Sequence, residues 1–192
     1  MITISQAGTP QEREAAFQLR YEVYIREFDY PFRASAARLT DEWDSMATIF
    51  LLEENGHLIG TARMNSAVSL PGTEEVERRY RLSSFPECPP KKIFIGSRAI
   101  LSRAARGGRQ FRFLFREIFR WGVTNDVRLA IIDSSPALVP LYLRLGWVRY
   151  PNNFQDPALG ERVPLVLRVT DHDYLQRIDS PFCAVLDNLE LR

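Results

Sequence analysis

The alternation of hydrophobic and polar positions along the chain predicts strands and helices that follow one another in a definite order. Apolar residues at every second position or in short runs predict strands, and apolar residues three and four apart predict helices. The predicted strands are residues 1–7, 47–54, 57–64, 92–101, 127–132, 147–150 and 163–170. The predicted helices are residues 10–28, a short segment after residue 73, the segment around 111–119, and 136–145. This order predicts an α/β fold with a mixed sheet.

Capping and turn residues mark several of these boundaries. Thr9-Pro10-Gln11-Glu12 has the pattern of a helix start, with a threonine cap, a proline in the first turn and a glutamate three residues after the cap. Asn55-Gly56 lies between two apolar runs and predicts a tight hairpin turn. Gly96 is expected to break the strand 92–101, and Gly146 is expected to end the helix 136–145.

The first predicted helix carries a charged residue beside its apolar face. That face is formed by aromatic residues at helical spacing, Phe17, Tyr21, Tyr24 and Phe28. Arg20 projects close to them, and an arginine at the border of a core needs a carboxylate partner. The acids of the segment Asp41-Glu42-Trp43-Asp44 are the candidate partners.

Composition excludes several classes of protein. With 192 residues, 45% of them hydrophobic, the chain is long and apolar enough to build its own core, unlike a disordered regulator, a collagen-like fibre or a disulfide-stapled miniprotein. Two cysteines and two histidines argue against a disulfide framework and a metal site. No apolar run approaches the roughly 20 residues of a membrane span, and residues 1–9 lack a secretion signal. We therefore expect a metal-free cytoplasmic protein without stable membrane insertion.

Charge is balanced overall but concentrated locally. The formal net charge is +1, yet the segment 98–120 carries +6, because Glu117 is its single acid against seven arginines: Arg98, Arg103, Arg106, Arg109, Arg112, Arg116 and Arg120. On a helix, the last four project opposite the apolar face, with Phe113 beside them. This pattern favours a localised anionic partner, since the arginine fork suits phosphates and carboxylates, and the alternative is a solvated helix face.

A glycine turn precedes that helix. Arg106-Gly107-Gly108 follows the predicted strand 92–101, and a strand, a glycine turn and a helix together can expose backbone N–H groups to a phosphate. By itself a Gly-Gly pair before a helix is a weak signal, because many tight turns look the same.

The order of elements and several motifs resemble the GNAT acyltransferase superfamily over residues 1–170. Arg106-Gly107-Gly108-Arg109-Gln110 resembles its pyrophosphate-binding loop, and the segment 141–147 resembles its later tyrosine and glycine-aromatic motif. The first half is most similar to acyl-homoserine-lactone synthases and N-acyl amino acid synthases. The shared features are an arginine on the first helix, two acids three residues apart, and Gly-Thr-x-Arg at a strand end, here Arg20, Asp41, Asp44 and Gly60-Thr61-Ala62-Arg63. Residues 179–182 also resemble the tail of N-acyl amino acid synthases.

The sequence departs from these families at two positions. Arg109 stands where the loop usually has a second glycine, which makes the loop imperfect for coenzyme A. Ile95 stands three residues before Arg98, where acyl-homoserine-lactone synthases carry a glutamate. The second departure argues against S-adenosylmethionine-dependent lactone synthesis.

The resemblance implies a fold and a division of the chain. We expect a largely antiparallel central sheet flanked by helices and splayed between the fourth and fifth strands. The acyltransferase domain would span residues 1–170, and residues 171–192 would form a C-terminal extension of unknown role.

The resemblance also implies transfer of an acyl group, long-chain in our interpretation, from a thioester to a small amino acid-like amine. No cofactor would be bound, because acyl carrier protein or coenzyme A would bring the acyl group as co-substrate. The expected catalytic residues are Tyr142 and Asp133. The expected donor-binding residues are Ala99, Leu101, Arg106, Gly107, Gly108, Arg109, Arg112 and Arg116. The residues expected to bind the acceptor or to brace the fold are Arg20, Asp41, Trp43, Asp44, Arg63 and Arg98.

Each of these roles has a structural alternative. Tyr142 could protonate the leaving thiolate or be a core residue, and Asp133 could hold the acceptor ammonium, relay a proton or cap the following helix. Backbone N–H groups from Ala99 to Leu101 would polarise the carbonyl. Arg63 could clamp a carboxylate or brace the first helix on the sheet, and Trp43 could shape a pocket or lie in the core.

Other functions stay open. The arginine-rich helix favours an acidic carrier protein over coenzyme A as the donor. Short-chain acetylation from acetyl-coenzyme A, acyl-homoserine-lactone synthesis and a catalytically silent GNAT-like binding domain are the alternatives. Nucleic-acid binding is not expected, because the aromatic residues lie mostly in core patterns.

Overall fold

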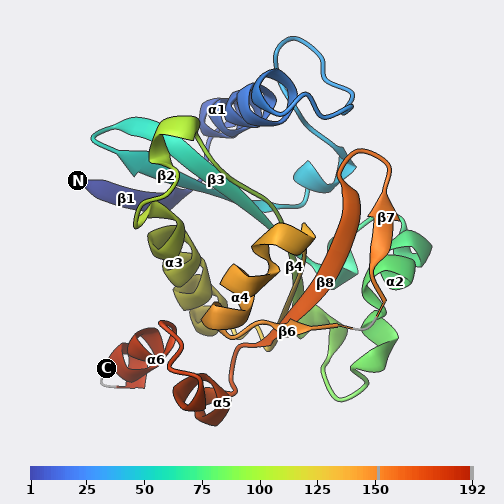
Figure 1. Cartoon of the computed structure of the whole chain (residues 1–192), viewed down its shortest axis with the longest axis vertical. Helices are drawn as coiled ribbons and strands as arrows, with labels where there is room; N and C mark the ends of the chain where they lie inside the picture. The colour runs from blue at the N-terminus through green and yellow to red at the C-terminus, as the bar shows by residue number, and fades with distance from the viewer. Residues whose placement is uncertain (151, 191–192) are drawn as a thin grey trace. The chain divides into compact units, whose positions relative to one another are not determined.

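The computed structural model describes residues 1–150 and 152–190. The chain forms two compact units, the first made of residues 1–65 and 96–115 and the second of residues 66–95 and 116–192. The strands belong to a mixed, mostly antiparallel sheet flanked by helices, which confirms the predicted fold class (Figure 1). The strands are β1 (Ile2–Gln6), β2 (Thr48–Glu54), β3 (His57–Ser66), β4 (Ile93–Leu101), β5 (Leu129–Ser134), β6 (Val148–Arg149), β7 (Phe154–Asp156) and β8 (Gly160–Arg168). The α-helices are α1 (Pro10–Tyr21), α2 (Thr73–Tyr80), α3 (Gln110–Thr124), α4 (Val139–Leu145), α5 (His172–Arg177) and α6 (Cys183–Glu190).

In the first unit, α1 packs on the hairpin of β2 and β3. The predicted capping box is present: Thr9 Oγ1 accepts from the Glu12 N–H, and the Glu12 carboxylate accepts from the Thr9 N–H at 2.9 Å. Strands β1, β2 and β3 pair antiparallel, and Asn55 and Gly56 adopt positive φ angles of 53° and 79° in the expected turn. The packing is apolar, with Ala16 and Phe17 of α1 buried against Ile49 and Leu51 of β2.

The first helix changes its winding after Tyr21. Residues Glu22–Glu27 form a π-helix, in which the Phe28 N–H donates to the Val23 carbonyl five residues back at 3.1 Å. The wider turn rotates the following side chains away from the α-helical register. Val23 is therefore buried, whereas Phe28 is 47% exposed. The prediction that Phe28 continues the core face of this helix is wrong for this reason.

Strand β4 is continuous through Gly96, so the predicted break at that glycine is wrong. The irregularity lies two residues later, where Arg98 has a φ of 53°. A non-glycine residue in this region costs of the order of 1–3 kcal/mol and persists only where surrounding contacts hold it. The parallel pairing of β4 with β5 covers three residues of each strand, ending at Ile95 and Ile131. A splay of the two strands beyond these residues stays a prediction.

In the second unit, β5 pairs antiparallel with β8, and β8 also pairs with β6 and β7. Strand β7 and helices α5 and α6 were not predicted. The C-terminal helices belong to this unit's core: Leu175 of α5 is fully buried, and the ring of Phe182 stacks on Phe119 of α3 with centroids 4.3 Å apart. Gly146 ends α4 with a φ of 109°, and a Cβ atom there would lie 2.5 Å from Leu175 Cδ2. Glycine suits this position because it adopts the positive φ without strain and leaves room for the Leu175 side chain of α5.

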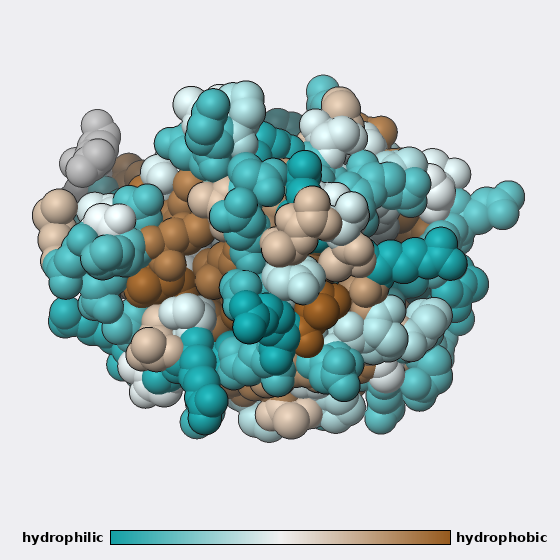
Figure 2. All heavy atoms as spheres, turned by 90° about the horizontal axis from the view of Figure 1, so that it is seen from above, coloured by the Kyte–Doolittle hydropathy of each residue, from teal (hydrophilic) through white to brown (hydrophobic). Residues whose placement is uncertain are grey.

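Helix α3 has the predicted division between an apolar and a charged side. Leu114, Phe115 and Phe119 are buried, whereas Arg112 and Arg116 are exposed. On the face of the molecule drawn in Figure 2, hydrophilic residues supply most of the outermost atoms, and hydrophobic residues show in smaller patches.

Candidate functional site

A short 3₁₀ helix, η2 (Glu42–Asp44), positions the two predicted acids of the first unit. Asp41 caps this helix, its Oδ1 accepting from the Trp43 N–H at 3.0 Å. In return, Asp44 Oδ2 accepts from the Asp41 N–H at 2.9 Å. The reciprocal bonds hold both carboxylates in fixed orientations and leave each of them able to bond side-chain partners.

Asp44 joins the two buried arginines of the cluster. Arg20 Nη1 lies 2.7 Å and Arg63 Nη1 3.0 Å from Asp44 Oδ1. Arg20 is 0% exposed, and burial lowers the pKa of its guanidinium while the charge of Asp44 opposes that shift. The expected carboxylate partner of Arg20 is thus Asp44. This ion pair fixes α1 to the segment that precedes β2.

Asp41 lies at the more open edge of the same cluster. Its Oδ1 contacts Arg63, and its Oδ2 accepts from Arg98 Nη2 at 2.9 Å. Burial by itself raises the pKa of the Asp41 carboxyl group, but the charges and hydrogen bonds of Arg63 and Arg98 outweigh it and bring this pKa to about 2. The Arg98 guanidinium also lies over the rings of Phe32, at 4.4 Å from the centroid, and Tyr24, at 5.4 Å. These contacts surround the strained residue of β4.

The contacts of Arg63 are those of a brace. Its side chain is 3% exposed, its Nε donates to Ser97 Oγ at 2.9 Å, and its guanidinium lies 5.5 Å from the Trp43 ring centroid. Trp43 is half-buried, which places it between the two predicted alternatives of pocket and core. The structure therefore brings together all six residues predicted to bind the acceptor or to brace the fold. Acceptor binding by any of them stays a prediction.

The predicted glycine turn precedes α3. Gly107 has a φ of 78°, a conformation that glycine adopts without the steric cost of a Cβ atom, and α3 begins at Gln110. Arg106 does not extend into solvent as expected of a phosphate ligand. Its Nη1 and Nη2 donate to the Glu27 carboxylate at 2.5 and 2.8 Å, and its Nε donates to the Leu101 carbonyl at 3.0 Å.

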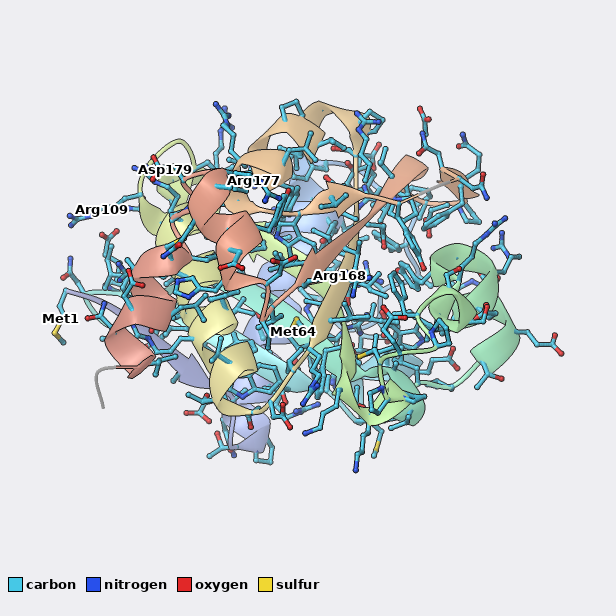
Figure 3. All side chains as sticks on the ribbon, turned by 90° about the horizontal axis from the view of Figure 1, so that it is seen from below. Met1, Met64, Arg109, Arg168, Arg177 and Asp179 are labelled. Carbon is cyan, nitrogen blue, oxygen red and sulfur yellow. The ribbon has the colours of Figure 1, made fainter. Side chains whose placement is uncertain are left out.

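The arginines after the turn differ in their partners. Arg109 and Arg112 are exposed, and within the residues that the structure describes they form no ion pair. Figure 3 shows the guanidinium end of Arg109 pointing away from the ribbon. Arg116 and Arg120 each approach Glu117, at 3.3 and 3.2 Å. Of the four arginines after the turn, Arg109 and Arg112 are therefore the two that no acid of the described residues neutralises.

The remaining predicted donor contacts are backbone groups of β4. Ala99 is exposed and Leu101 is buried, one and three residues after Arg98. The positive φ of Arg98 changes the direction of the chain immediately before them. Polarisation of a carbonyl by their N–H groups stays a prediction.

In the second unit, Asp133 belongs to a network that the sequence did not predict. Tyr80 of α2 donates its hydroxyl to Asp133 Oδ1 at 2.6 Å. Arg162 of β8 donates through Nε to Oδ2 at 2.5 Å and through Nη2 to the Asp133 carbonyl at 2.8 Å. Burial, with the neighbouring Asp133 charge, raises the pKa of Tyr80 well above its ordinary value, so the phenol stays a hydrogen-bond donor. The alternative that Asp133 caps the next helix is wrong, because Ser135 holds that position.

No sequence signal could have identified the partners of Asp133. Tyr80 and Arg162 are 53 and 29 positions away along the chain, and neither belongs to a recognisable motif. Tyr142, the other predicted catalytic residue, is buried on α4, with its ring edge-on to Trp147 at a centroid distance of 6.2 Å. Its environment is that of the core alternative, and protonation of a thiolate by it stays a prediction.

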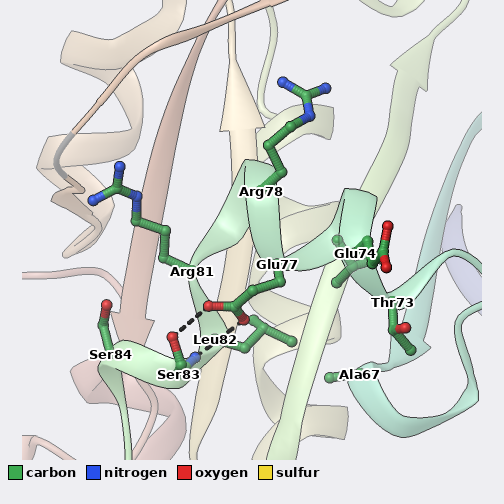
Figure 4. A pocket seen from close by; sticks show the side chains of 10 residues that line it. Ala67, Thr73, Glu74, Glu77, Arg78, Arg81, Leu82, Ser83 and Ser84 are labelled. Carbon is green, nitrogen blue, oxygen red and sulfur yellow. Dashed lines mark hydrogen bonds between the residues drawn. The ribbon is translucent and has the colours of Figure 1, made fainter.

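A surface pocket of about 910 Å³ lies beside α2 (Figure 4). Its charged groups are largely paired: the Glu77 carboxylate accepts from the Ser83 N–H and contacts the Ser83 hydroxyl, and Arg78 donates to Glu75 at 2.7 Å. None of the predicted site residues lines this pocket. It therefore belongs to neither of the two clusters above.

Two further findings concern metals and membranes. Over residues 1–150 and 152–190, no three or more histidine, cysteine, aspartate or glutamate side chains gather as a metal site would require. In the same described part of the chain, every helix is too short or too polar to span a bilayer.

Comparison with known proteins places this architecture in a family. The family model described as the acetyltransferase (GNAT) domain matches residues 19–116, which include the acid–arginine cluster and the glycine turn. The chain belongs to the GNAT acetyltransferase family. It is therefore an acyltransferase, as the sequence predicted. No curated protein matches the sequence.

Several solved structures share the fold over 88–98% of this chain. FeeM, an N-acyl amino acid synthase from uncultured soil microbes, superposes with a TM-score of 0.71 at 14% identity, covering 96% of this chain and 99% of its own. BjaI, a CoA-dependent acyl-homoserine lactone synthase solved with SAM and isopentyl-CoA, gives 0.70 at 19%, covering 98% and 99%. ElaA from Escherichia coli gives 0.61 at 16%, covering 88% and 100%. At these identities the likeness is one of fold.

Proposed function

We propose that the protein is an N-acyltransferase that moves an acyl group, long-chain in our view, from a coenzyme A or carrier-protein thioester to the amine of a small amino acid-like acceptor. The observation that carries the proposal is the glycine turn before α3. Gly107 adopts positive φ there, and the exposed Arg109 and Arg112 follow it, all within the segment that matches the family. Such a turn offers backbone N–H groups and guanidinium groups to the phosphates of a donor.

The reaction needs three events. The acceptor ammonium loses a proton, and the amine nitrogen then attacks the thioester carbonyl carbon. Backbone N–H groups after the bend of β4 at Arg98 stabilise the oxyanion of the tetrahedral intermediate. The C–N bond stays, the C–S bond breaks, and the departing thiolate takes a proton from the Tyr142 hydroxyl, whose ordinary pKa near 10 is close to that of a thiol. The first proton of the ammonium passes to water, and the second proton that the nitrogen loses as the amide forms returns to Tyr142 through water.

A donor series tests the proposal. Purified protein is incubated with acyl-coenzyme A or acyl carrier protein thioesters of two to sixteen carbons. The acceptors are a mixture of the twenty common amino acids or S-adenosylmethionine, and products are identified by mass spectrometry. Amide products formed from long-chain thioesters and an amino acid are the expected result. Absence of product from every donor and acceptor would refute the proposed function.

Short-chain acetylation is the second candidate, because the matching family is described as an acetyltransferase domain. The same series separates the two, since an acetyltransferase prefers the two-carbon donor. A kcat/KM that rises with acyl length supports the long-chain proposal, and one that falls steeply after two carbons supports acetylation.

The carrier protein as donor is a finer part of the proposal, supported by the exposed arginines of α3. An acidic carrier protein would meet Arg112 and Arg116, whereas coenzyme A depends mainly on the turn. Reversal of both charges, with Arg112→Glu and Arg116→Glu, should raise KM for acyl carrier protein and spare acyl-coenzyme A. The matched control reverses Arg128 and Arg168, which lie outside α3 and whose side chains are 59% and 50% exposed. Equal losses for both donors would contradict carrier-protein docking on α3.

A further inference from the structure

The Asp133 network presents an anion and a cation side by side. Asp133 and Arg162 form an ion pair at 2.5 Å, with side chains 13% and 15% exposed, so neither partner is fully enclosed. Asp133 is the second-last residue of β5 and lies beyond the residues of that strand that pair with β4. In open α/β sheets, the carboxyl ends of parallel strands border the ligand crevice.

The donors of Arg162 are only partly used. Its Nε and Nη2 are engaged by Asp133, but within the described residues no hydrogen bond or ion pair involves Nη1. A guanidinium has five N–H donors in one plane, so fixing one edge aims the others. The Asp133 carboxylate likewise accepts one side-chain donor on each oxygen and keeps lone pairs for another.

Tyr80 holds the Asp133 carboxylate of the pair in place. Tyr80 is 1% exposed, and its ring packs edge-on against Phe154 with a centroid distance of 6.1 Å. A second ion pair flanks the network, with Arg79 Nη1 3.0 Å from Asp156 Oδ2. Because Asp156 already neutralises Arg79, the accessible charges of this neighbourhood are those of Asp133 and Arg162.

We propose that Arg162 and Asp133 together bind the zwitterionic end of an α-amino acid acceptor, with Arg162 taking the carboxylate and Asp133 the ammonium. Tyr80 is a positioning residue that fixes the Asp133 carboxylate. The inference rests on the proposed function and narrows its acceptor from an amino acid-like amine to an α-amino acid with a free carboxylate. A side-by-side anion and cation complements a zwitterion, because each charge of the ligand meets its opposite. A simple amine would leave the remaining N–H donors of Arg162 unmatched.

This assignment differs from the one expected for Arg63. Arg63 is buried and already bonded to Asp41, Asp44 and Ser97, so a bound carboxylate would have to displace a native partner. Arg162 keeps unused donors at a partly exposed position. The second unit therefore supplies a better carboxylate-binding group than the one that the sequence indicated.

The test compares three acceptors that share one side chain: the amino acid used best in the mixture of twenty, its carboxamide, and its decarboxylated amine. We expect wild-type protein to prefer the free amino acid in kcat/KM by roughly 10- to 100-fold, which corresponds to hydrogen bonds to a charged group. Arg162→Gln should abolish this preference by lowering kcat/KM for the amino acid alone.

The matched control is Arg168→Gln, on the same strand, because Arg168 is exposed and pairs with Glu87 at 3.0 Å. It should keep the preference of the wild type. Tyr80→Phe should raise KM for the amino acid several-fold, whereas Tyr150→Phe should not, since the Tyr150 hydroxyl donates to the Arg81 carbonyl outside the network. A purely structural network would affect all three acceptors alike.

The outcomes separate this inference from the proposed function. No acyl transfer by wild type to any amine would refute the function itself. Acyl transfer with equal use of amino acid, amide and amine would leave the function standing and overturn the inference. This wild-type comparison needs no variant, so the inference stays testable even if Arg162→Gln does not fold.

Discussion

Replacing Asp44 with asparagine removes the charged partner of a buried arginine while keeping the size of the side chain. Arg20 is 0% exposed and lies 2.7 Å from Asp44, so the Asp44→Asn variant leaves its guanidinium charge buried without a counter-ion. Arg63 keeps a second acid, Asp41, and is less affected. Breaking a buried pair on one side costs about 3–5 kcal/mol. Against the roughly 5–15 kcal/mol of unfolding free energy typical of a folded protein, this is a large fraction.

Urea unfolding followed by circular dichroism measures the effect. A thermal melt gives a second measurement: the expected loss of about 3–5 kcal/mol in unfolding free energy lowers the melting temperature by roughly 6–20 °C, at about 2–4 °C per kcal/mol for a chain of this size. The control is Glu22→Gln, which breaks an exposed pair with Arg26, whose side chains are 52% and 65% exposed. That change should cost about 0.5 kcal/mol or less.

A double variant distinguishes a missing counter-ion from a general packing fault. Arg20→Met combined with Asp44→Leu removes both charges, and buried pairs replaced by apolar residues often lose little stability. We expect this variant to be more stable than Asp44→Asn. A loss below about 1 kcal/mol for Asp44→Asn would show that the pair does not hold α1 in place, and the bracing argument would be wrong.

Three further predictions concern the first unit. The pKa of Asp41 is lowered from 3.8 to about 2 on folding, so its contribution to the free energy of unfolding is complete above pH 4 and is lost as the pH falls towards 2. In urea titrations at successive pH values, Asp41→Asn should remove about 2 kcal/mol of this acid-dependent loss of stability. Gly107→Ala should lose about 1 kcal/mol because of the positive φ alone, whereas Gly122→Ala inside α3 should gain stability; a neutral Gly107→Ala would argue against the turn conformation. Glu27→Gln should release Arg106 and tighten coenzyme A binding in calorimetry, and an unchanged Kd would exclude Arg106 from donor binding.

Sequence reasoning succeeded where local chemistry decides the structure. The capping box at Thr9, the Asn55-Gly56 turn and the glycine turn at Gly107 all follow from the conformational preferences of the residues themselves. The partner of Arg20 could be narrowed to Asp41 or Asp44, because a charge at the edge of a core face requires an acid and these two match the acid pair of the similar families, and the structure selects Asp44.

The sequence could not predict features that depend on contacts made after folding. The π-helix after Tyr21 leaves the apolar spacing of the first helix intact, so nothing in the pattern reveals that Phe28 is exposed. The left-handed conformation of Arg98 is held by Asp41, Tyr24 and other distant residues rather than by its own preference. The Asp133 network likewise joins three separate elements, and no spacing along the chain encodes such a meeting.

The stacked rings of Phe119 and Phe182 have a consequence for shortened versions of the protein. A version ending at Thr170 would lose the stacking partner of Phe119 and the Leu175 side chain that fills the space beside Gly146. It would also lose the Ser180 hydroxyl that donates to the Leu145 carbonyl at 2.7 Å, leaving the end of α4 without this support. Trimming the tail to isolate a minimal catalytic core would therefore expose aromatic surface to water and favour aggregation over a smaller working enzyme.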